Sequence, residues 1–101
     1  MKIVSSLPPM LQQEPSWVRG RMSPGGQYRV IVSFGDTEGD EHHIGEQWTF
    51  LGSWFSKFDD DVTLFVRTPD AKNFRFSLHW TPDTQENVIE NILTYLEYVR
   101  R

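Results

Sequence analysis

The sequence predicts an α+β domain: a strongly curled antiparallel sheet of four to five strands, or a small open barrel, covered by one C-terminal helix. Several segments alternate apolar and polar residues with the two-residue period of a strand. The last segment instead repeats apolar residues at helical spacing. Gly45 and Gly52 suggest points where the sheet bends, and Gly52 predicts a bulge within its strand. The expected order is β-β-β-β-α.

The chain has 101 residues, which suits one domain and leaves no room for a second independent core. Four of its six prolines lie within residues 1–26. Proline removes a backbone donor and biases its predecessor toward extended geometry, so no long regular element is expected there. We therefore predict an extended N-terminal arm over residues 1–25, anchored by Trp17 and Val18, and a single α+β domain over residues 26–101.

Four strands are expected within the domain. Residues 28–34 and 74–80 alternate most clearly between apolar and polar side chains. A shorter strand is expected at residues 48–51, and a further one at residues 62–67, which are rich in β-branched and aromatic side chains. Turn-forming residues at 69–73 predict a hairpin between the last two strands.

A helix is expected at about residues 82–100. Thr81 can cap its free amides, and Pro82 fits the first helical position. Apolar residues from Val88 to Val99 follow helical spacing and form one stripe, with polar residues opposite. This amphipathic pattern predicts a helix that covers the sheet.

Composition disfavours several classes of protein. The net charge is −4, which disfavours a general nucleic-acid binder, since such proteins neutralise phosphates with Lys and Arg. The chain has no cysteine and hence no disulfide, thiolate zinc site or thiol nucleophile. The N-terminal residues lack the apolar run of about 7–15 residues of a signal peptide, and no stretch approaches the roughly 18 apolar residues of a membrane span. A cytoplasmic protein without membrane contact is expected.

The acidic loop at residues 35–46 is the most tempting metal site, because His42 and His43 adjoin several carboxylates. Neighbouring residues of an extended chain point to opposite sides, however, so both histidines would rarely reach one ion. Glu41 also stands where a calcium-binding loop needs glycine. We expect a solvated hairpin loop with no metal or cofactor. The alternative is a small metal-dependent protein or enzyme that uses His42, His43 and Glu46.

Catalytic residues are not expected. Asp59, Asp60 and Asp61 are consecutive in a turn, where carboxylates are normally solvated and all ionised, so they do not form an acid–base pair. His79 falls on the polar face of its strand, and no Gly-x-Ser-x-Gly motif is present in the chain. The sequence therefore predicts a protein that is not an enzyme.

Aromatic residues give the clearest indication of a binding site. The chain has four tryptophans and seven phenylalanines, which could exceed what one small core hides. Trp54, Phe55 and Phe58 place bulky groups on both faces of residues 52–58. An exposed aromatic patch ringed by charge is typical of a protein-binding surface. Alternatively, the helix and the N-terminal arm cover both faces.

Several segments form a recognisable series: Tyr28-Arg29-Val30, Gly45-Glu46-Gln47-Trp48-Thr49-Phe50-Leu51-Gly52, Leu64-Phe65-Val66 and Leu78-His79-Trp80, with Gln85 and Ile89. The series resembles a small bacterial family known as a domain of unknown function, number 3601, over roughly residues 26–98. Its most specific part is the stretch at 45–52. The resemblance implies one compact domain and brings no established activity or catalytic residue.

The leading hypothesis is a non-catalytic protein-interaction module that binds another protein with a basic surface. Its acidic loops would steer the encounter and set specificity. One version is a small immunity or inhibitor protein that masks the basic active site of a toxin. A third hypothesis is small-ligand or single-strand nucleic-acid binding on exposed aromatics. The candidate partner-binding residues are Trp54, Phe55, Phe58, Asp36, Glu38, Asp40, Glu41, Asp59, Asp60 and Asp61.

Overall fold

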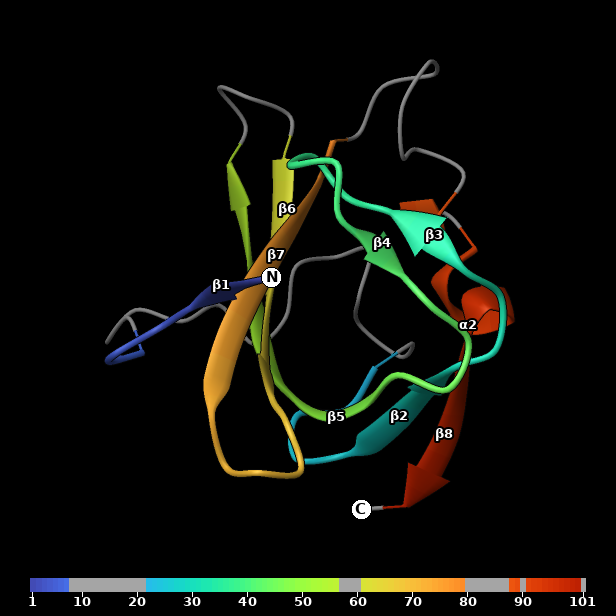
Figure 1. Ribbon diagram of the computed structural model, residues 1–101, viewed down its shortest axis with the longest axis horizontal. Coiled ribbons are helices and arrows are strands. Elements are labelled where there is room, and N and C mark those ends of the chain that lie inside the picture. Colours follow the sequence, from blue (N-terminus) through green and yellow to red (C-terminus); the bar gives the residue numbers. More distant parts are fainter. Residues whose placement is uncertain (8–21, 57–60, 80–87, 90, 101) are drawn as a thin grey trace.

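The computed structural model describes residues 1–7, 22–56, 61–79, 88–89 and 91–100, with the backbone alone at residues 55, 56 and 100 (Figure 1). Its elements in chain order are β1 (Lys2–Ile3), β2 (Gln27–Val30), β3 (Phe34–Gly35), β4 (Glu41–His42), β5 (Gln47–Ser56), β6 (Asp61–Arg67), β7 (Asn73–His79), α2 (Ile92–Tyr95) and β8 (Leu96–Arg100).

A six-stranded antiparallel sheet dominates the fold, in the order β1-β7-β6-β5-β2-β8. β3 and β4 form a separate two-stranded sheet. The predicted strand at residues 28–34 is therefore divided between two sheets. β2 ends at Val30, residues 31–33 are exposed, and β3 begins at Phe34. The mostly antiparallel architecture agrees with the predicted fold class.

The sheet is open and not strongly curled, so the prediction of a curled sheet or small barrel is wrong. β1 and β8 are its two edges and lie on opposite sides of the molecule in Figure 1. The prediction relied on Gly45 and Gly52 as bending points. Gly45 lies in the turn between β4 and β5, with a φ of 100°. Gly52 shifts the register of β5 locally and leaves the sheet open.

The bulge predicted at Gly52 is confirmed, and it changes which residues of β5 face the core. The register with β6 shifts between Phe50 and Gly52. Before the shift, Trp48 and Phe50 are buried, and after it Ser53 is buried while Trp54 is exposed. Because alternate residues of a strand point to opposite faces, Trp54 lies on the face opposite the core. We call this face the outer face.

The hairpin of β6 and β7 confirms the strands predicted at residues 62–67 and 74–80, except for Trp80, which lies outside the described residues. In its turn, the Thr68 amide donates a hydrogen bond to the Lys72 carbonyl, 2.9 Å long. One face of the hairpin contributes to the core. The whole core cluster consists of Met22, Tyr28, Val30, Phe34, Trp48, Phe50, Val62, Leu64, Val66, Phe76, Leu78, Val88, Ile89, Ile92 and Leu96.

The C-terminal segment is only partly helical, which corrects the helix predicted at residues 82–100. Residues 88–89 are helical, α2 ends at Tyr95, and the chain continues directly into β8. β8 pairs with β2, whose backbone groups on that edge would otherwise lack strand partners. Tertiary pairing thus overrides the helical spacing of the apolar residues. No helix among the described residues has the length and apolar character to cross a membrane.

The N-terminal residues form an edge of the sheet. Lys2 and Ile3 pair with Arg75 and Phe74 of β7. Met22 packs into the core. Residues 8–21 lie outside the described residues, and with them the proposed anchors Trp17 and Val18.

Candidate functional site

A buried polar group lies between the two-stranded sheet and the main sheet. It consists of Asp36, His42, Glu46 and Trp48, which we call the His42 cluster. The loop from β3 to β4 positions Asp36, whose Oδ1 accepts hydrogen bonds from the amides of Glu38 and Asp40, at 2.9 and 3.2 Å. Such carboxylate–amide bonds are typical of turns that begin with aspartate.

Both ring nitrogens of His42 face carboxylates. Nδ1 lies 2.6 Å from Oε2 of Glu46, and Nε2 lies 2.8 Å from Oδ2 of Asp36. The indole of Trp48 donates a further bond to Oε2 of Glu46, at 3.0 Å. Only 1% of the His42 side chain and 0% of the Asp36 side chain are exposed, against 25% for Glu46.

Aromatic rings enclose the imidazole. Phe34 stacks on His42 with a centroid distance of 4.8 Å, and Phe76 packs at 4.3 Å. Burial acts to lower the pKa of His42, but the hydrogen bonds to Glu46 and Asp36 and their negative charges outweigh it, so the pKa is raised. The cluster therefore favours an imidazolium that donates to two carboxylates.

The His42 cluster is suited to holding the fold together. A metal ion or a substrate would have to displace a carboxylate from the ring, because both nitrogens have partners. His43 points away and is exposed, as the alternation of an extended chain predicts. Among the residues that the structure describes, no group of three or more histidine, aspartate or glutamate side chains is arranged to hold a metal.

The outer face carries two rows of cross-strand neighbours, which share a face. The first row runs from Trp54 through Thr63 to Ser77. The Thr63 and Ser77 hydroxyls form a hydrogen bond 2.7 Å long. The Ser77 carbonyl accepts a hydrogen bond from the amide of Thr37, 2.9 Å long. This row therefore connects Trp54 with residues 37–40, which we call the hairpin tip.

The second row runs parallel to the first. It crosses Gly52, Phe65, Arg75 and Lys2 on four adjacent strands. Lys2 then forms an ion pair with Glu38 of the hairpin tip, with Nζ and Oε2 3.0 Å apart. The outer face is thus continuous from the aromatic end of β5 to the acidic hairpin tip.

A cavity of about 340 Å³ lies on the outer face, and we call it the Trp54 cavity. Trp54 is 46% exposed, whereas Phe65 beside it is only 4% exposed. Among the described residues, no hydrogen bond or ion pair involves the guanidinium of Arg75. The described residues that line it are Val4, Ser6, Trp54, Thr63, Phe65 and Arg75.

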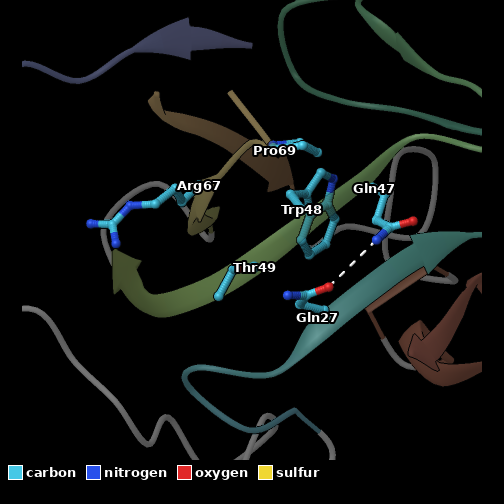
Figure 2. Close-up of a pocket in the computed structure, with 6 residues that line it drawn as sticks. All are labelled: Gln27, Gln47, Trp48, Thr49, Arg67 and Pro69. Atoms are coloured by element: carbon cyan, nitrogen blue, oxygen red, sulfur yellow. Dashed lines mark hydrogen bonds between the residues drawn. The ribbon is translucent and has the colours of Figure 1, made fainter. Parts of the chain in front are cut away.

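A second cavity, of about 270 Å³, lies near the start of β5 and is lined by Gln27, Gln47, Trp48, Thr49, Arg67 and Pro69 (Figure 2). Gln47 donates to Gln27 at 3.5 Å. Figure 2 shows Arg67 extending away from this glutamine pair, and its Nε donates to Asn73 instead, at 3.0 Å. Since the polar groups do not converge, this cavity favours no particular ligand.

The predicted acidic residues divide between the interior and the hairpin tip. Asp36 is buried in the His42 cluster, so it cannot contact a partner directly. Glu38, Asp40 and Glu41 are exposed. Glu38 pairs with Lys2, and the N-terminal ammonium group lies 2.9 Å from Oδ2 of Asp40.

The remaining candidates lie at the far end of β5 and β6. Asp61 is half-buried, and its carboxylate forms a hydrogen bond with Nδ1 of His79, its cross-strand neighbour. Phe55 is placed by its backbone within β5. Phe58, Asp59 and Asp60 lie outside the described residues.

Sequence reasoning did not place Arg75, Thr63 or Ser77 among the candidate partner-binding residues. The signal was present in the alternation of residues 62–67 and 74–80, which places all three opposite the core side chains. It did not show which strands would be neighbours. Only the pairing of β5, β6 and β7 brings these residues beside Trp54.

Comparison with known proteins supports the fold. No protein-family model matches the chain, and no curated protein matches it significantly. An integron cassette protein from the mobile metagenome of Vibrio cholerae has a similar solved structure, with a TM-score of 0.78 and 25% sequence identity. The match covers 88% of this chain and 93% of that protein. The resemblance to domain of unknown function 3601 stays a prediction.

Proposed function

We propose that this protein is a non-catalytic interaction module that binds another protein through the outer face of its sheet. The observation that carries the proposal is the exposure of Trp54. Nearly half of this large ring, 46%, remains accessible beside the cavity on the outer face. Tryptophan is enriched among the residues that dominate binding energy at protein interfaces.

The surroundings of Trp54 support the same proposal. Thr63 and Ser77 supply a polar surface next to the ring, and the hairpin tip supplies the carboxylates of Glu38 and Asp40 at the β1 edge. Aromatic anchors with a polar and charged rim are the usual composition of a protein-binding surface.

A partner with a basic surface fits the charge of the molecule. The net charge of −4 would accelerate encounter with such a partner. Glu41 next to the hairpin tip has no ion-pair partner among the described residues. A small immunity or inhibitor protein that covers the basic active site of a toxin is one concrete form of the proposal.

Affinity purification from the native host, followed by mass spectrometry, tests the proposal. We expect the unmodified protein to retain one dominant basic partner, and the Trp54→Ala variant to lose it. Ile44→Ala is the matched control, because Ile44 is 69% exposed but lies in the turn between β4 and β5. Equal retention by the Trp54→Ala variant, or no partner for any form, would contradict the proposal.

A further inference from the structure

The Trp54 cavity combines apolar walls with a cation. Trp54 and Phe65 supply aromatic surface, Val4 an aliphatic side chain, and Arg75 a guanidinium. The volume of about 340 Å³ falls within the range of about 300–1,000 Å³ that is usual for small-molecule sites. The cavity is therefore large enough for a compact organic molecule.

The charge of the lining residues restricts the chemistry of a ligand. Among the lining residues that the structure describes, Arg75 is the cationic side chain, and none carries a carboxylate. Lys2, its cross-strand neighbour, is held by Glu38, with Nζ and Oε2 3.0 Å apart. Among the described residues, no hydrogen bond or ion pair engages the Arg75 guanidinium. One unpaired guanidinium matches a single carboxylate, with which it can form two parallel hydrogen bonds.

The hydroxyl groups of the lining are uncharged, so Arg75 supplies the charge that a ligand meets there. The Thr63 hydroxyl already forms a hydrogen bond with Ser77, 2.7 Å long, and Ser6 is the other hydroxyl among the described lining residues. A phosphate dianion would call for more than one cation or for several backbone amides. A planar apolar body with one carboxylate fits the lining better.

We propose that the Trp54 cavity binds a free small aromatic carboxylate, its ring against Trp54 and Phe65 and its carboxylate at Arg75. The site shares Trp54 with the proposed partner-binding surface, but binding of a free ligand requires no protein partner. A ligand of about a dozen non-hydrogen atoms with ordinary efficiency binds with a Kd on the order of 1 mM.

Three probes with the same indole ring test the proposal on the purified full chain: indole-3-acetate, indole-3-acetamide and tryptamine. Binding is followed by the NMR shift of the Trp54 indole N–H. We expect the anion to bind about tenfold more tightly than the neutral amide, and the cation most weakly, because a charge-assisted bond is stronger than a neutral one.

Two arginine variants test whether Arg75 is the residue that causes the preference for the anionic probe. Arg75→Gln is expected to abolish the preference for the anion and to leave the amide bound as before. Arg67→Gln is the matched control, because Arg67 lies on the outer face of β6 but lines the other cavity. It is expected to keep the preference.

The amide spectrum of each variant reports whether it is folded. Equal binding of the three probes, an anion preference that survives in Arg75→Gln, or no saturable binding of indole-3-acetate in the millimolar range would overturn the proposal. Because no partner is present in the experiment, its failure would leave the proposed protein interaction standing.

Discussion

The His42 cluster and the Trp54 cavity use similar components in opposite ways. Each combines aromatic rings with a cationic side chain. In the His42 cluster, two carboxylates and two phenyl rings enclose the imidazole, and its side chain is 1% exposed. In the Trp54 cavity, the indole is 46% exposed, and the Arg75 guanidinium has no partner among the described residues.

From this difference we propose that the His42 cluster serves the fold and the Trp54 cavity serves recognition. A buried charge is tolerated when its hydrogen bonds are complete, and removing one partner is costly. An exposed ring beside an unpaired cation contributes little to folding and leaves surface free for a ligand or partner. Substitutions should therefore affect stability in the first region and binding in the second.

The largest effect is expected for His42→Gln. Glutamine cannot carry the positive charge between Asp36 and Glu46, so two carboxylates remain close together with less compensation. Breaking a buried ion pair costs about 3–5 kcal/mol, which is a large part of the stability of a domain this size. Urea unfolding of the variant measures the loss.

His43→Gln is the matched control for this measurement. His43 is exposed and adjacent in the chain, so its replacement should change the free energy of unfolding by less than about 0.5 kcal/mol. Equal effects of the two substitutions would show that the His42 cluster does not stabilise the fold. If His42→Gln does not fold at all while His43→Gln does, the comparison still stands.

A smaller loss, about 2 kcal/mol, is expected for Asp36→Asn. The amide keeps an oxygen that can accept from Glu38 and Asp40, but it removes the charge that faces Nε2 of His42. Glu46→Gln should cost less, because the Glu46 side chain is 25% exposed and that of Asp36 is 0% exposed. Urea unfolding of both variants measures the two losses of stability. A larger loss for Glu46→Gln would show that Glu46, and not Asp36, is the carboxylate that contributes more to stability.

The stability should also depend on pH through His42. The pKa of His42 is raised in the folded protein, whereas an unfolded histidine titrates near about 6.5. The stabilisation is therefore complete below that unfolded value and is lost as the pH rises through the folded pKa. Unfolding free energies of the unmodified protein and His42→Gln should converge as the pH increases above neutrality. A difference that widens instead would mean that the neutral imidazole is the form that the fold stabilises.

Among the substitutions within the two regions, the smallest effect on stability is expected for Trp54→Ala. Nearly half of the ring is exposed, at 46%, and its removal from the outer face leaves the core cluster intact. We expect a loss of about 1 kcal/mol or less in urea unfolding. A loss as large as that of His42→Gln would place Trp54 among the residues that hold the sheet together.

The sequence predicted most of the strands because their side chains alternate. Residues 62–67 and 74–80 have one apolar face and became β6 and β7, and the bulge at Gly52 occurred where the pattern of β5 changes. The C-terminal strand was missed because Leu96 and Val99 continue the helical spacing of the apolar residues before them. Tyr98 and Val99, which lie in β8, were the available signal, since β-branched and aromatic residues favour strands.

The candidate sites were less predictable because they depend on pairing. His42 and Glu46 were identified as neighbours in an acidic loop, but their burial follows from the packing of Phe34 and Phe76 around the ring. Trp54 was identified from the local density of aromatic residues. Arg75 lies 21 positions away in the sequence, and two strand pairings bring it to the same cavity.

The central claim is that Trp54 serves binding and not folding, and one variant measured in two ways tests it most directly. For Trp54→Ala, we would determine the free energy of unfolding and, from the NMR signals of the probe, the Kd for indole-3-acetate on the same preparation. The account predicts stability within about 1 kcal/mol of the unmodified protein and binding weakened by about tenfold or more. Strong destabilisation with binding of the probe retained would contradict it.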